Sequence, residues 1–133
     1  GIDPQKLSRE EFLILEGELF YNICEELKEI FRKQYKEYFR LSKFTLEMEN
    51  SMLEQNYLRF VFNDILSTQE YTLEGLAYYV GSHADVVYEV ILGSNFNPSA
   101  ILLHKAIALH RSLRGDLYKT IIKKIVEKYS VAA

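Results

Sequence analysis

The chain has 133 residues, of which 48% are hydrophobic and 26% charged, and its net charge is −3. This composition is typical of one folded globular domain, and a single cysteine, Cys24, excludes a secreted scaffold held by internal disulfides. No apolar run approaches the roughly 18–20 residues that cross a bilayer, and the first residues do not resemble a signal peptide. We therefore expect a cytoplasmic protein without a membrane partner.

The charges are unevenly distributed along the chain. Residues 67–104 contain four acidic residues and no Lys or Arg, whereas residues 105–133 contain seven Lys or Arg against Asp116 and Glu127. Any contact with nucleic acid must therefore take its cations from outside the acidic middle segment.

Residues 1–66 are predicted to form a pair of long antiparallel helices, roughly 9–40 and 44–66. Ser8 followed by Glu11 is a capping box, which places the first helix start at about residue 9. No glycine or proline lies between Gly17 and Gly75, and the apolar residues recur with helical spacing. The wide apolar faces of these helices indicate a further packing partner, either the C-terminal half or a second copy.

The joint between these two helices has two candidate positions. It falls either at residues 41–44, where Ser42 can cap a helix, or at residues 50–51, where Ser51 and Glu54 form a second capping box.

Residues 67–133 are predicted to form four shorter helices. Thr72 and Leu73 open the first, which ends near Gly81, and residues 84–92 form the second, which Gly93 ends. Ser99 then caps a helix to about residue 113, and a basic helix follows the interruption at residues 115–116 and runs to about residue 130.

Small residues punctuate the first two of these helices at a specific spacing. Ala77 precedes the turn, Gly81 opens it, and Gly93 follows twelve residues later. Together with Leu73, Leu76, Val80, Val87, Val90, Pro98, Ser99, Leu102 and Ala108, they make residues 72–113 resemble the lambda-repressor-like (Xre/Cro-type) helix-turn-helix family. The expected fold is all-α, with a long N-terminal helix pair (residues 1–66) joined to a helix-turn-helix bundle (residues 67–133).

The resemblance implies a DNA-binding transcriptional regulator that acts as a homodimer, with residues 9–66 pairing the subunits. The positions that face base edges in the family match His83, Ala84, Asp85 and Tyr88, and Glu89 lies beside them. Asp85 and Glu89 depart from this pattern, because base readout favours Arg, Lys, Asn or Gln at these positions. Their negative charges also repel the DNA phosphates. The alternative is a protein-interaction module whose acidic helix docks a basic protein partner.

Two basic sets are candidates for contacting DNA phosphates. One is a helical stripe that begins at Arg32, and the other is the basic C-terminal region. The alternative for the stripe is a solvated outer face of the helix. The alternative for the C-terminal region is that its charges keep the last helix soluble. The predicted phosphate contacts are Arg32, Lys36, Arg40, Lys105, Arg111 and Arg114.

The sequence predicts no catalytic, metal or cofactor site. His104 and His110 are six residues apart, so they do not share a helix face as paired ligands would. Cys24 lies on an apolar stripe, and the glutamates at 25, 26 and 29 lack the Glu-x-x-His motif of a di-metal bundle. Phosphate-binding glycine loops and nucleophile motifs are also missing, so we do not expect an enzyme.

Overall fold

The computed structural model describes residues 8–94 and 98–132. The all-α prediction is confirmed, since these residues form helices and connections without a strand. In chain order the helices are α1 (Arg9–Gln34), α2 (Lys36–Leu41), α3 (Leu46–Gln55), α4 (Tyr57–Ser67), α5 (Leu73–Val80), α6 (Ala84–Ile91), α7 (Ala100–Leu113) and α8 (Gly115–Ala132).

The predicted continuous helix over 9–40 is wrong, because the chain bends at Tyr35 and separates α1 from α2. The hydrogen bonds continue through the bend: Tyr35 N–H donates to Phe31 O (3.1 Å) and Phe39 N–H donates to Tyr35 O (3.0 Å). The Tyr35 ring stacks on Phe60 of α4, with ring centroids 4.7 Å apart. The bend contains no glycine or proline, and it coincides instead with this tertiary stacking.

The predicted helix over 44–66 is also two helices, α3 and α4, which meet at Asn56. The side-chain amide of Asn56 donates to the Met52 carbonyl oxygen at 3.0 Å, a local bond that competes with regular helix geometry. The joint between α2 and α3 lies at residues 42–45, where Lys43 has φ 55° and Thr45 caps α3. It overlaps the first of the two candidate positions, residues 41–44. Ser51 lies inside α3, so the second candidate position is wrong.

The four C-terminal helices agree closely with the sequence-based boundaries. At the start of α7 the Ser99 hydroxyl accepts from the Leu102 N–H at 3.1 Å, as the capping pattern predicts. The capping pattern predicted for α1 is also present, since the Ser8 hydroxyl accepts from the Glu11 N–H at 3.1 Å. Gly115 begins α8 and therefore belongs to the helix that it was expected to precede.

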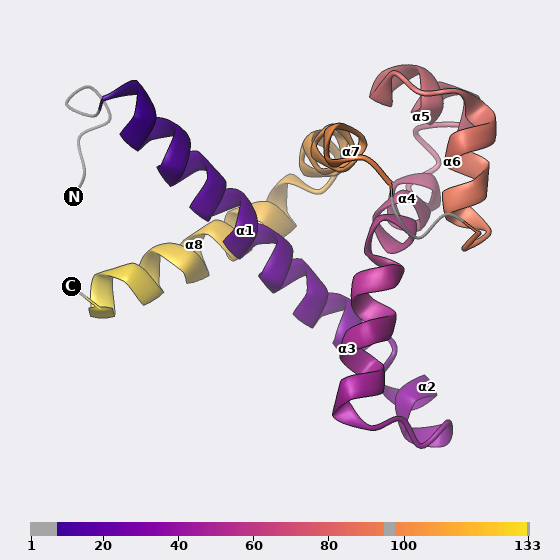
Figure 1. The fold of residues 1–133 in the computed structure, drawn as a ribbon, viewed down its shortest axis with the longest axis horizontal. Coiled ribbons are helices and arrows are strands. Elements are labelled where there is room, and N and C mark those ends of the chain that lie inside the picture. Colours follow the sequence, from indigo (N-terminus) through magenta and orange to yellow (C-terminus); the bar gives the residue numbers. More distant parts are fainter. Residues whose placement is uncertain (1–7, 95–97, 133) are drawn as a thin grey trace.

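Helix α4 lies at the centre of the packing. Its Val61, Phe62 and Ile65 have no exposed surface and pack between α6 and α7. Helices α5 and α6 form one end of the molecule, and α2 with the start of α3 forms another (Figure 1). Helices α1 and α8 cross, and their outer ends extend toward the chain termini (Figure 1). None of the described helices combines the length and apolar character needed to cross a bilayer.

Candidate functional site

Helices α5 and α6 form a compact unit joined by the short turn Gly81–His83. Gly81 ends α5 in the left-handed conformation, with φ 69° and ψ 33°, which a glycine adopts without steric cost. Ser82 N–H donates back to Ala77 O at 3.0 Å and closes the turn. Ala77 is 3% exposed, so its small side chain sits where the helices of this end pack together.

The outer face of α6 brings the five predicted DNA-binding residues together. Val87 and Val90 point into the core, which leaves His83, Asp85, Tyr88 and Glu89 exposed and Ala84 partly exposed. His83 is the N-cap, and its side chain makes no capping bond to a described residue. Val86 N–H donates to His83 O at 3.1 Å, so the N–H groups of Ala84 and Asp85 are the ones that can donate to an anion.

Aromatic and acidic side chains dominate the surface around α6. Tyr78 of α5 is 89% exposed and Tyr88 of α6 is 51% exposed. Glu74, Asp85 and Glu89 are exposed on the same two helices, which contain no Lys or Arg. The helix pair by itself therefore presents a negative surface with projecting tyrosines.

Tertiary packing brings two cations to the ends of this acidic unit. Lys105 of α7 helps to line a hollow of about 230 Å³ at the α5–α6 turn, and its Nζ lies 3.0 Å from the place that a Cβ on Gly81 would take. Arg59 of α4 lies at the other end of α6, with Nη1 3.1 Å from the corresponding position on Gly93. Lys105 was predicted as a phosphate contact and Arg59 was not. The one available signal for Arg59 was that it is the only Lys or Arg of α4.

Three of the other predicted phosphate contacts lie in the N-terminal helices. Arg32 pairs with Glu29 (3.2 Å) and Glu49 (3.0 Å) and also hydrogen-bonds Asn50. Arg40 pairs with Glu37 at 2.8 Å, and both it and Lys36 belong to α2. Figure 1 places α2 at a different end of the molecule from α5 and α6.

The remaining two candidates lie on α7 and its C-cap. Arg111 lines a hollow between α7 and α1, and Arg114 binds Asp64. Among the six candidates, all of which the structure describes, Lys105 alone lines the hollow at the α5–α6 turn.

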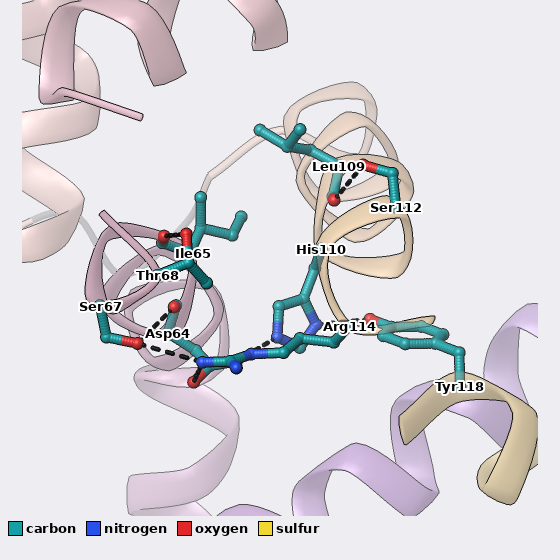
Figure 2. Close-up of polar contacts among 9 residues, drawn as sticks. All are labelled: Asp64, Ile65, Ser67, Thr68, Leu109, His110, Ser112, Arg114 and Tyr118. Atoms are coloured by element: carbon teal, nitrogen blue, oxygen red, sulfur yellow. Dashed lines mark hydrogen bonds and ion pairs between the residues drawn. The ribbon is translucent and has the colours of Figure 1, made fainter. Parts of the chain in front are cut away.

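A polar network connects α4, α7 and α8 (Figure 2). The His110 Nε2 lies 2.6 Å from Asp64 Oδ2, and His110 Nδ1 lies 2.7 Å from the Tyr118 hydroxyl. Arg114 donates to both carboxylate oxygens of Asp64, at 3.0 and 3.1 Å, and to the Ser67 hydroxyl at 3.3 Å. The network holds α7, the helix that carries Lys105, against α4 and α8.

The protonation state of the network follows from its surroundings. Burial lowers the pKa of His110 despite the opposing influence of Asp64. Burial by itself would raise the pKa of Asp64, but hydrogen bonds from Arg114 and His110 outweigh it and the net shift is downward. Asp64 is thus a carboxylate that accepts from the His110 Nε2–H, which leaves Nδ1 as the acceptor for the Tyr118 O–H.

This network has the geometry of a structural cross-link. The His110 side chain is 1% exposed, and both of its ring nitrogens are occupied by protein partners. A general base needs a free nitrogen within reach of a substrate, and His110 offers none. Its distance from Asp64 alone would otherwise suggest acid–base chemistry.

One buried carboxylate of α1, that of Glu26, also has structural partners. Glu26 of α1 is buried and accepts from Lys124 (2.9 Å) and Lys128 (2.8 Å) of α8, and hydrogen bonds from these two lysines lower its pKa. Within the described residues, no group of three or more His, Cys, Asp or Glu side chains is arranged to hold a metal ion.

Comparison of the chain with protein-family models, with curated proteins and with solved structures finds no match. The resemblance to lambda-repressor-like proteins therefore stays a prediction from the sequence.

Proposed function

We propose that this protein binds duplex DNA through α5 and α6 and acts as a homodimeric transcriptional regulator. The observation that carries the proposal is the α5–turn–α6 unit itself, with left-handed Gly81 in the turn and an exposed outer face on α6. Such a short helix, free on its outer side, has the dimensions to enter a major groove.

Two features of the packing support contact with phosphates. Lys105 lies at the turn before α6, and Arg59 lies beside Gly93 just after it. Cations at both ends of α6 offset part of the repulsion from Asp85 and Glu89, and the uncapped N-terminus of α6 adds backbone donors. In this arrangement Asp85 reads cytosine, since a carboxylate accepts from the N4 amino group of that base.

A titration against random duplex DNA at two salt concentrations tests this proposal, with fluorescence anisotropy as the readout. We expect binding that weakens steeply with salt, because cations displaced from the DNA drive the association. Absence of binding at low salt, where the electrostatic attraction is strongest, would overturn the proposal.

A matched pair of variants identifies the surface responsible. Lys105→Ala is expected to weaken binding and to reduce the slope of log K against log salt by about one. Lys36→Ala removes an exposed lysine from α2 and serves as the control, which we expect to bind like the wild type. Equal losses in the two variants would show that the protein's charge, and not the α5–α6 surface, attracts DNA.

A specific observation favours a second function, the docking of a basic protein partner. The helices α5 and α6 expose Tyr78, Tyr88, Asp85 and Glu89 but no cation of their own. Exposed tyrosines and acids on the same helix pair suit a partner rich in Arg or Lys. The double variant Asp85→Lys/Glu89→Lys separates the two functions, because it should strengthen DNA binding and weaken a basic protein partner.

A further inference from the structure

Helices α1 and α8 carry apolar side chains that remain partly exposed. Leu13 and Leu19 of α1 are 56% and 39% exposed, and Val126 of α8 is 56% exposed. Figure 1 shows both helices extending past their crossing, away from the α5–α6 end. Apolar surface collected on projecting helices is a common mark of an interface.

The exposed side of α1 borders an open groove. A hollow of about 430 Å³ separates α1 from α7, lined by Leu13, Glu16, Leu19 and Phe20 on one side and by His104 and Arg111 on the other. Phe20 stacks on His104 with ring centroids 3.8 Å apart. This contact closes one part of the groove, while Leu13 and Glu16 remain exposed.

Helix α8 has an outer face that complements this groove. Lys119, Ile122, Lys123 and Val126 follow the i, i+3, i+4, i+7 spacing and share one side of the helix. This side differs from the core-facing side, which is formed by Tyr118, Ile121 and Ile125. Lys119 and Lys123 make no ion pair with another described residue, whereas Lys124 and Lys128 hold Glu26.

The two helices that would meet have net charges of opposite sign. The first half of α1 contains four glutamates, at positions 10, 11, 16 and 18, against Arg9, and of these Glu16 lines the groove, together with Arg111 of α7. Helix α8 contains four lysines against Asp116 and Glu127. Because one chain carries both surfaces, a second copy is the partner that satisfies both at once. We propose that α8 of each copy docks by its Lys119–Val126 face into the α1–α7 groove of the other, which forms a two-fold symmetric dimer.

The dimer deepens the proposed function, and rests on it for its role, because it would place two α5–α6 units on one symmetric DNA site. It also assigns dimerisation to α1, α7 and α8, whereas α3 and α4 use their buried residues in the monomer core. The interface itself does not depend on DNA, so the two proposals can be tested separately.

Sedimentation equilibrium on the full chain tests the interface through two charge-reversal variants. Glu10→Lys/Glu16→Lys makes both surfaces basic, and Lys119→Glu/Lys123→Glu makes both acidic. Each variant alone is expected to be monomeric, since like charges meet at both contacts of its homodimer. Their equimolar mixture is expected to recover the dimer mass, because each contact in the heterodimer joins opposite charges. A mixture that stays monomeric, or single variants that dimerise like the wild type, would overturn the proposal.

A matched pair of apolar variants gives an independent test. Leu13→Ala is expected to raise the dimer dissociation constant about tenfold, whereas Leu41→Ala, at a similarly exposed leucine of α2, is expected to leave it unchanged. Circular dichroism shows whether both variants keep the wild-type helix content. A wild-type protein that is monomeric at about 100 µM would rule out the dimer and leave the groove to a different occupant.

The outcomes for the two proposals are distinguishable. A dimer of the expected mass without DNA affinity overturns the proposed function and leaves this interface standing. A monomer that binds DNA with a steep salt dependence overturns this interface and the homodimeric state, and leaves the proposed DNA binding through α5 and α6 standing.

Discussion

His110 Nε2 lies 2.6 Å from Asp64 Oδ2, and this contact joins α7 to α4 inside the protein. The carboxylate also receives two hydrogen bonds from Arg114, while the second imidazole nitrogen meets Tyr118 of α8. Because His110 is 1% exposed, folding removes water from its imidazole. The hydrogen bonds to Asp64 and Tyr118 offset the free-energy cost of this desolvation.

Asp64→Asn is expected to destabilise the protein by about 2–3 kcal/mol. An amide has one acceptor oxygen and places an NH₂ group against the donors of Arg114 or His110, so at least one donor loses its partner. Urea unfolding followed by circular dichroism measures the loss. Asp116→Asn on the exposed surface of α8 is the control, expected to change stability by no more than about 0.5 kcal/mol. Equal effects at both positions would contradict a structural role for Asp64.

Stability should fall as the pH drops below about 6.5, the ordinary pKa of histidine. The folded state keeps the pKa of His110 below that value, so the unfolded chain binds a proton that the native state refuses. The loss begins below the unfolded pKa and continues until the pH reaches the folded pKa. Asp64, whose folded pKa is lowered, contributes stability above about pH 3.8 that is lost as the pH falls through its folded pKa.

The variant His110→Gln isolates the histidine contribution to this pH dependence. Unfolding free energies measured between pH 7 and pH 5 should decline less steeply for the variant than for the wild type. Parallel curves for the two proteins would show that His110 does not carry the effect.

Tyr118→Phe is expected to cost about 1–2 kcal/mol, because it leaves His110 Nδ1 buried without a donor. Tyr57 provides a contrast on a ring that is also buried. Its hydroxyl has no hydrogen-bond partner within range among the described residues, and its polar neighbour is the thiol of Cys24, a weak acceptor. Tyr57→Phe should therefore leave stability unchanged or raise it slightly. Thermal unfolding of both variants decides the matter, and similar losses would contradict the assignment of hydrogen bonds.

Gly81→Ala is expected to destabilise the protein by about 1–2 kcal/mol, since φ of 69° is strained for any residue with a Cβ. The neighbouring Lys105 Nζ, 3.0 Å from the added carbon, ends a flexible side chain and can move aside. Gly115→Ala is the matched control: it meets no atom within 4 Å and should gain up to about 1 kcal/mol from helix propensity. A neutral Gly81→Ala, measured by thermal unfolding, would mean that the turn tolerates another conformation.

Local chemistry was sufficient to predict most of the C-terminal helices. Ser99 starts α7 because its hydroxyl satisfies a backbone N–H, and Gly81 ends α5 because it adopts a left-handed conformation. These interactions span only a few residues, so they can be read from the amino-acid sequence. The bend at Tyr35 could not, because it accompanies stacking on Phe60, which is distant in the sequence. The bend at Asn56 coincides with a local bond to the Met52 carbonyl, but an asparagine within a helical pattern does not by itself predict a bend.

The candidate site divides in the same way. The exposed residues of α6 were predictable, since a helical period with Val87 and Val90 buried leaves His83, Asp85 and Tyr88 outside. Their charge environment was not predictable, because Lys105 and Arg59 come from α7 and α4 and reach α6 only through packing of the core.

The sequence by itself determined the all-α class, the positions of most helix ends and the acidic outer face of α6. Each of these depends on capping, helical period or charge within one segment. Tertiary structure alone decided that Arg32 and Arg114 are held in ion pairs, that Lys105 stands at the α5–α6 turn, and that His110 meets Asp64. These contacts join residues that are far apart in the chain. Hydrophobic burial packs the helices around α4 and so brings the residues together, and no local sequence pattern predicts which residues will meet.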